Sequence, residues 1–244
     1  MDAEISDVLT ETSFYKAMVL AKGTVSVIDR NGTCWTRIWC IFELYHSVVD
    51  INKQGYTWDA YTALDTPITR EVLDMDAFGQ GQGSESEMEV LLQAVGFSTG
   101  LTAVDFDHSE RFKAGRESAF PMSLIDIGIR FKCMAAQASV AADAERIKLQ
   151  IGNHSAQLDA DLHGVVAAAS LGRVLKEASE GSSDGMSRAN QYLEAIKLGN
   201  VRSLSVDFKR IYKEEWLQRL FEAMAIVTHD AIQIKIRFPL VTTN

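Results

Sequence analysis

The chain has 244 residues, a formal net charge of −9 and 47% hydrophobic residues, which is an ordinary composition for a folded, globular protein. The negative charge and the scattering of the 24 basic residues argue against a nucleic-acid surface, because phosphate binding requires clustered Lys and Arg. The acidic start has no apolar signal region, and no apolar run approaches the length of a membrane span, so we expect neither secretion nor membrane insertion. The cysteines Cys34, Cys40 and Cys133 have no C-x-x-C spacing and fit a reducing compartment, so we expect a cytoplasmic protein in which the two glycosylation sequons have no role.

The first elements along the chain alternate between helix and strand. Apolar residues at helical spacing predict a helix over 5–20, which Lys22-Gly23 ends. The β-branched run 24–29 predicts a buried strand, and Asn31-Gly32 predicts a tight turn. A second helix is predicted over 36–50. This order of elements indicates a layered α/β fold.

In that second helix an apolar stripe is predicted to face the core. It comprises Ile38, Ile41, Phe42, Tyr45, Val48 and Val49. The neighbouring stripe comprises Trp39, Glu43, His46 and Asp50, which places Glu43 at the edge of the buried face. We expect His46 to be a partly exposed helix residue, with pairing to Glu43 as the alternative.

Further elements follow with less regular patterns. Residues 55–64 predict a strand, 65–85 a long loop, 86–95 a helix and 101–106 a strand. Helices are predicted over 121–131, with proline in the first turn, and over the alanine-rich stretches 139–151 and 156–179. Residues 180–185 predict a linker, followed by a short helix, a strand over 201–208, an amphipathic helix around 214–225 and a strand over 232–238.

Two polar segments are weighed as ligand sites. The glycine-rich residues 79–83 lack the Lys-Ser/Thr of a phosphate loop and precede several glutamates, so a flexible loop is expected. Asp105, Asp107, His108 and Glu110 have side chains that can ligate a divalent cation, but such a run more commonly ends a strand and caps a helix. We therefore expect no metal and no resident cofactor.

The segment "TVSVIDRNGTCWTRIWCIFEL", residues 24–44, resembles the strand–loop–helix region of Toll/interleukin-1 receptor (TIR) and TIR-like domains. The matching residues are Trp39, Cys40, Glu43 and Leu44, and Arg37 gives the motif the R-x-W-C-x-x-E form that we associate with TIR-like domains of protists. The resemblance implies a flavodoxin-like layered sheet with flanking helices. It covers about 30 residues closely and about 130 loosely, and the elements that a complete TIR domain has before this strand are missing.

The resulting interpretation divides the chain into three parts. Residues 1–135 form an N-terminally incomplete TIR-like α/β domain, 136–180 a helical segment and 186–244 a strand–helix–strand tail. The expected function is an intracellular signalling or scaffold module that associates with protein partners or with itself. The alternative implied by the resemblance is a TIR-type NAD glycohydrolase, in which Glu43 is the catalytic acid and NAD is a substrate. The residue pattern alone is also satisfied by Glu43 as a boundary residue near Arg37, and by Trp39 and Cys40 as packing residues.

Overall fold

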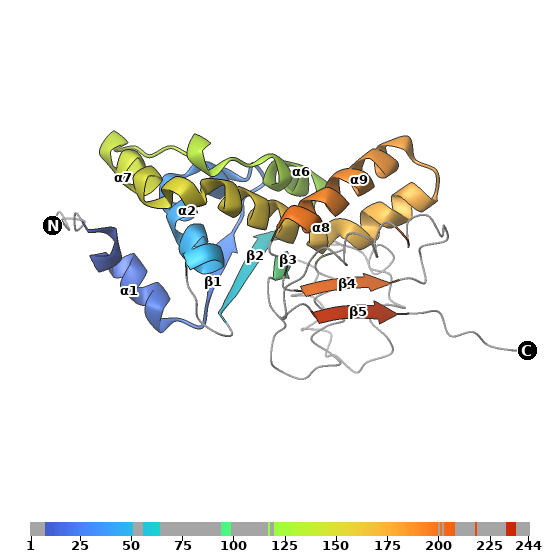
Figure 1. The fold of residues 1–244 in the computed structure, drawn as a ribbon, viewed down its shortest axis with the longest axis horizontal. Coiled ribbons are helices and arrows are strands. Elements are labelled where there is room, and N and C mark those ends of the chain that lie inside the picture. The colour runs from blue at the N-terminus through green and yellow to red at the C-terminus, as the bar shows by residue number, and fades with distance from the viewer. Residues whose placement is uncertain are drawn as a thin grey trace, which may run out of the picture.

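A computed structural model describes residues 8–50, 56–63, 94–98, 117, 120–199, 201, 203–207, 218 and 233–237. Within these residues the chain is a mixed α/β protein in which helices predominate (Figure 1). The helices are α1 (Ser13–Leu20), α2 (Ile38–Tyr45), α6 (Met122–Arg130), α7 (Ala141–Ile151), α8 (Ser155–Ser179) and α9 (Ser183–Leu198). The strands are β1 (Gly23–Val27), β2 (Thr57–Ala63), β3 (Ala94–Ser98), β4 (Ser203–Asp207) and β5 (Gln233–Arg237). The short turns are the 3-10 segments η1 (Leu9–Glu11), η2 (Thr33–Thr36), η4 (Cys133–Ala135) and η5 (Gly152–His154), and the π-helical turn η3 (His46–Asp50).

The first helix is shorter than the sequence predicts. The prediction of one helix over 5–20 is wrong for residues 9–12, because α1 begins only at Ser13, after η1. Thr12 is the N-cap: its backbone is extended, and its Oγ1 accepts a hydrogen bond from the Tyr15 N–H at 3.3 Å. The cap satisfies one of the free amides at the helix start and so fixes the boundary there. Residues 5–7 lie outside the described part.

The predicted strand and the turn after it are present. Gly32 adopts φ 64°, a left-handed conformation that favours glycine. Asp29 closes the turn by accepting hydrogen bonds from the Thr33 N–H at 2.7 Å and from its hydroxyl at 2.6 Å. The expectation that this strand is buried is wrong. Val25 is 62% exposed and Val27 is 76% exposed, because only one face of β1 packs against the protein.

The three N-terminal strands form one sheet in the order β1-β2-β3. β1 and β2 are parallel, in register from Gly23 opposite Thr57 to Val27 opposite Tyr61, and α2 lies between them in the chain. β2 confirms the strand predicted over 55–64. β3 pairs with β2 in the antiparallel sense, whereas a flavodoxin-like sheet is parallel.

β3 also corrects a helix prediction. Ala94 and Val95, placed at the end of a helix over 86–95, lie in a strand instead. Pairing with β2 supplies hydrogen bonds that the local pattern does not reveal. Residues 86–93, the loop 65–85 and the strand predicted over 101–106 lie outside the described residues.

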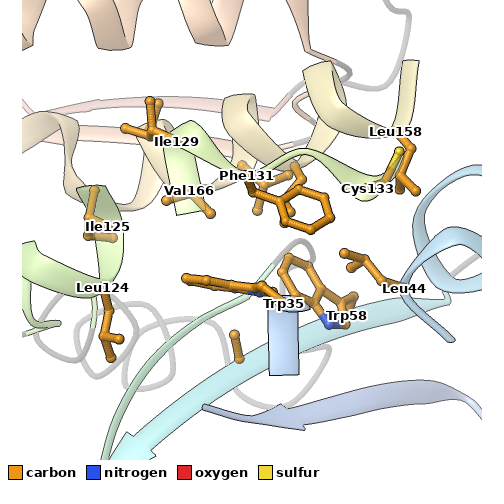
Figure 2. Close-up of a cluster of buried hydrophobic side chains, with 14 of the residues drawn as sticks. Trp35, Leu44, Trp58, Leu124, Ile125, Ile129, Phe131, Cys133, Leu158 and Val166 are labelled. Carbon is orange, nitrogen blue, oxygen red and sulfur yellow. The ribbon is translucent and has the colours of Figure 1, made fainter. Parts of the chain in front are cut away.

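The core lies between the N-terminal sheet, α2, α6 and α8 (Figures 1 and 2). The predicted apolar stripe of α2 is confirmed for Ile38, Ile41, Phe42 and Tyr45, which are all buried. Figure 2 shows Trp35 from η2 and Trp58 from β2 facing side chains from α6 and α8. The Trp58 Nε1–H donates to Ser26 Oγ at 2.9 Å, which ties β2 to β1 within this core. Side chains of α2 thus share one core with the sheet and with α6 and α8.

The later helices follow the sequence closely. The helices predicted over 121–131, 139–151 and 156–179 are confirmed as α6, α7 and α8. The helix expected to be short after the linker is wrong in length, since α9 has 16 residues and packs along α8 as a helical hairpin (Figure 1). Residues 180–182 of the expected linker are therefore the turn between two packed helices.

The C-terminal strands predicted over 201–208 and 232–238 are present as β4 and β5, which pair in parallel. β4 contacts α8. Apart from Gln218, the helix predicted around 214–225 falls outside the described residues.

Candidate functional site

The R-x-W-C-x-x-E motif lies at the start and along the exposed side of α2. Arg37 is the residue before the helix, with an extended backbone. Two backbone hydrogen bonds fix this start: the Ile38 N–H donates to Gln137 O at 2.8 Å, and the Gln137 N–H donates to Thr36 O at 2.9 Å. The first turn of α2 is thus anchored to the segment that follows α6, and the motif is presented on a rigid element.

Glu43 is half-buried on α2. Its backbone carbonyl accepts a hydrogen bond from Ser47 Oγ at 2.7 Å, while its carboxylate accepts none within the described part of the chain. Burial raises the pKa of the Glu43 carboxyl above its ordinary value, and the positive charge of Arg37 partly offsets this effect. A carboxyl of this kind retains its proton to a higher pH than an exposed glutamate and can act as a general acid.

The other motif residues have packing roles. The Trp39 Nε1–H donates to Asp143 Oδ2 at 3.3 Å, which links α2 to α7. Cys40 is half-buried, and burial together with the Glu43 charge raises the pKa of its thiol, so it remains protonated and is a weak nucleophile. Leu44 is buried in the core. The motif therefore brings Arg37, Cys40 and Glu43 into one electrostatic environment, while Leu44 belongs to the interior.

The expectation that His46 is partly exposed is wrong, since this side chain is 1% exposed. Its ring packs against the rings of Tyr15, Phe42 and Tyr45, with centroids 4.8, 4.4 and 5.0 Å away, and its Nε2 lies 3.3 Å from Gln150 Nε2. The physical reason is that two other helices cover this side of α2. The His46 N–H still donates to Phe42 O, as in an α-helix, so His46 keeps its position on the stripe. Tyr15 from α1 and Gln150 from α7 pack over that position and bury the ring.

Sequence reasoning missed Asp143, a buried carboxylate in the first turn of α7. Besides accepting from Trp39, it forms an ion pair with Arg146 at 2.5 Å. The D-x-x-R spacing on a predicted helix is a usable signal for this ion pair, because residues three apart are neighbours on a helix surface. The partner on α2, 104 positions earlier in the chain, has no such signal.

A second missed feature is a hydrogen-bond chain beneath Glu43. Ser47 Oγ lies 2.8 Å from Thr24 Oγ1, and Thr24 Oγ1 lies 2.7 Å from Tyr56 Oη. Because the Ser47 hydroxyl proton is donated to the Glu43 carbonyl, Ser47 Oγ accepts from the Thr24 hydroxyl in this chain. The chain connects η3 to β1 and to the start of β2, and it fixes the end of α2 relative to the sheet.

A cavity of about 580 Å³ lies away from the motif, between η2, α6 and the segment 131–136. Its lining residues are Trp35, Thr36, Ser123, Asp126, Ile127, Arg130, Phe131, Lys132, Ala135 and Ala136. Neither Glu43 nor any other motif residue contributes to this cavity. Glu43 and the cavity are therefore separate features.

Within the described ranges, no group of three or more His, Cys, Asp or Glu side chains is placed to hold a metal ion. Asp105, Asp107, His108 and Glu110, and the glycine-rich residues 79–83, lie outside those ranges. Among the described helices none is both long enough and apolar enough to cross a membrane. Comparison of the chain with models of protein families, with curated proteins and with solved structures found no match.

Proposed function

We propose that this chain is a TIR-like protein-association module that works in the cytoplasm and that its contact surface is formed by α1 and β1. The observation that carries the proposal is a set of large apolar side chains that are exposed within 14 consecutive residues, 14–27. We call Phe14, Leu20, Val25 and Val27 the α1–β1 surface, in which Leu20 is 85% exposed. Exposed large apolar side chains on successive elements favour contact with another protein.

The strand in this surface supports the same conclusion. β1 is the terminal strand in the described sheet order, with β2 on its other side. Val25 and Val27 alternate along β1, so their side chains lie on the same face, while Ser26 accepts a hydrogen bond from Trp58 on the inner side. A terminal strand with an apolar exposed face is suited to pairing with another chain. The proposed occupant is a second copy of this chain.

The fold that accompanies this proposal is a flavodoxin-like, TIR-like arrangement of residues 1–135. Its support is the parallel pair β1 and β2, with α2 between them in sequence, and the motif on α2. The antiparallel β3 is a departure from that arrangement.

Sedimentation velocity from low micromolar to several hundred micromolar protein tests the association. The wild type should show a dimer that forms with increasing concentration, and the double variant Val25→Lys/Val27→Lys should remain monomeric. Leu149→Lys is the matched control, because Leu149 is 84% exposed but lies on α7. A monomeric wild type at all concentrations, or equal dimerisation of all three proteins, would refute the proposed surface.

A second candidate function is NAD glycohydrolysis, with NAD as substrate and Glu43 as catalytic acid. The observation that favours it is the half-buried Glu43 carboxyl, whose pKa is raised and which has no hydrogen-bond donor in the described part of the chain. Cleavage of a glycosidic bond passes through an oxocarbenium-like transition state, which a placed carboxylate stabilises.

The test is NAD consumption by the purified wild type, by Glu43→Gln and by Glu194→Gln. Glu194 is an exposed glutamate on α9 and serves as the matched control. Turnover in the wild type and in Glu194→Gln, with loss in Glu43→Gln, would establish the enzyme. Absence of turnover in the folded wild type would eliminate it.

A further inference from the structure

The cavity between η2, α6 and the segment 131–136 has the size and lining of a small-molecule site. Its volume of about 580 Å³ lies within the range of about 300–1,000 Å³ that is usual for ligand pockets. It is independent of both Glu43 and the α1–β1 surface. Two stretches that are far apart in the chain, 35–36 and 123–136, build its wall, so its shape depends on the folded protein.

The wall contains two aromatic side chains that are held in place. Trp35 is 4% exposed, and its six-membered ring lies against Gly32 and Gly128, where an added Cβ would be 3.1 Å and 3.0 Å from ring carbons. Phe131 is also buried, and its backbone carbonyl lies 2.8 Å from His163 Nε2. Figure 2 shows Trp35 and Phe131 in the same cluster of buried side chains. A rigid aromatic wall favours a flat, apolar ligand group.

The indole Nε1–H of Trp35 adds a polar feature. This donor is buried and has no acceptor within the described part of the chain. Buried donors are normally paired, and an unpaired one requires an explanation. Among the tryptophans that the structure describes, the indole donors of Trp39 and Trp58 are paired with Asp143 and Ser26.

The charges around the cavity leave one cation without a counter-ion. Asp126 is paired with Arg188 at 3.5 Å, and Lys132 is paired with Asp159 at 3.5 Å. Arg130, in the last turn of α6, is exposed and has no ion pair within the described residues. In a chain of net charge −9, this arrangement makes the rim of the cavity locally attractive to an anion.

We propose that this cavity binds a small organic anion that carries a planar aromatic ring. The ring packs against Trp35 and Phe131, and the anionic group contacts the guanidinium of Arg130, with Lys132 beside it at the rim. Arginine suits this role because its planar fork can donate two parallel hydrogen bonds to a carboxylate, a sulfonate or a phosphate. The exposed Ser123 hydroxyl is a further donor on α6.

Fluorescence titration of the full chain with anilinonaphthalene sulfonate tests the proposal, because this probe combines a fused aromatic ring with an anion. Saturable binding is expected in the wild type, with affinity about tenfold lower in Arg130→Glu, since the substitution replaces an attraction by a repulsion. Arg173→Glu is the matched control. Arg173 is an exposed arginine on α8 outside the cavity, and its substitution should leave the affinity unchanged.

Ala135→Trp provides a second variant that does not depend on charge. Ala135 is an exposed residue of the lining, so a large side chain there should fill the mouth of the cavity and abolish binding without entering the core. Circular dichroism confirms that each variant is folded. Naphthoate and phenyl phosphate as competitors distinguish a carboxylate from a phosphate ligand, and the neutral naphthalenemethanol should compete weakly.

Equal probe affinity in the wild type, Arg130→Glu and Ala135→Trp would overturn the proposal, because the probe would then be bound at another apolar surface. Absence of saturable binding to the folded wild type would overturn it as well. Loss in both cavity variants with retention in Arg173→Glu would establish the site.

Discussion

Replacing each of two glycines of α8 by alanine should have opposite effects on stability. Gly164 is buried where α8 approaches the end of α9. A Cβ added there would lie 3.0 Å from Gly199 Cα, 3.0 Å from Val201 Cγ2 and 3.1 Å from Ala195 O. Gly172 lies two turns further along the same helix, and a Cβ added there would meet nothing within 4 Å.

The magnitudes follow from these surroundings. Alanine is favoured over glycine inside a helix by about 1 kcal/mol, so Gly172→Ala should raise the free energy of unfolding by about 0.5–1 kcal/mol. Gly164→Ala has the same helical gain, but it crowds backbone atoms that cannot rotate away. Overpacking costs about 1–3 kcal/mol, so the net effect is a destabilisation of about 1 kcal/mol. The two variants should differ by about 2 kcal/mol, as the difference between these estimates.

Urea unfolding followed by far-ultraviolet circular dichroism measures both effects. The midpoint should rise for Gly172→Ala and fall for Gly164→Ala, with the denaturant dependence unchanged. Gly199→Ala gives an independent check, because its Cβ would lie 2.5 Å from Ala160 O in the same contact. If Gly164→Ala is as stable as Gly172→Ala, α8 and α9 do not approach as closely as described, and the reasoning is refuted.

Three further predictions concern buried groups. Trp58→Phe should destabilise the protein by about 1 kcal/mol more than Trp35→Phe, because, of these two indoles, Trp58 alone donates a hydrogen bond. Thermal unfolding measures the difference, and equal losses of stability in the two variants would contradict it. Since burial raises the pKa of Glu43, its protonated form stabilises the fold below the unfolded-state pKa, and this stabilisation is lost as pH rises through the folded-state pKa. Glu43→Gln should therefore be more stable than the wild type at neutral pH and lose that advantage below about pH 4. Unfolding at several pH values measures this, and a stability difference that does not change with pH would exclude the raised pKa of Glu43. Burial raises the pKa of the Cys133 thiol to about 12, so iodoacetamide at neutral pH should label Cys133 only after unfolding. Mass spectrometry detects the label, and labelling of the native protein would contradict the burial of Cys133.

The elements that could be predicted from the sequence are those whose signals are local. Pro121 marks the start of α6, the apolar spacing of 156–179 predicts α8 closely, and Asn31-Gly32 predicts the turn after β1. The stripe on α2 also follows from spacing alone, and it correctly assigns Ile41 to the core. In each case the residues that determine the structure are within a few positions of one another in the chain.

The candidate site could be predicted only in part, because its environment is assembled from distant segments. The α-helical period places Glu43 beside the core, and the structure finds it half-buried there. The same period gives the wrong exposure for His46, because Tyr15 from α1 and Gln150 from α7 pack over it. The partner of Trp39 on α7 is equally beyond a local pattern.

The sequence by itself determined the α/β character, the later helices and the face of α2 that enters the core, because periodicity and turn residues act over a single element. Tertiary structure alone decided that β3 is a strand, that β1 has an exposed apolar face, and that Trp35, Phe131 and Arg130 surround one cavity. These features depend on which elements pack together. Apolar patterning specifies that a residue should be buried, but the partner that buries it is chosen by the whole fold.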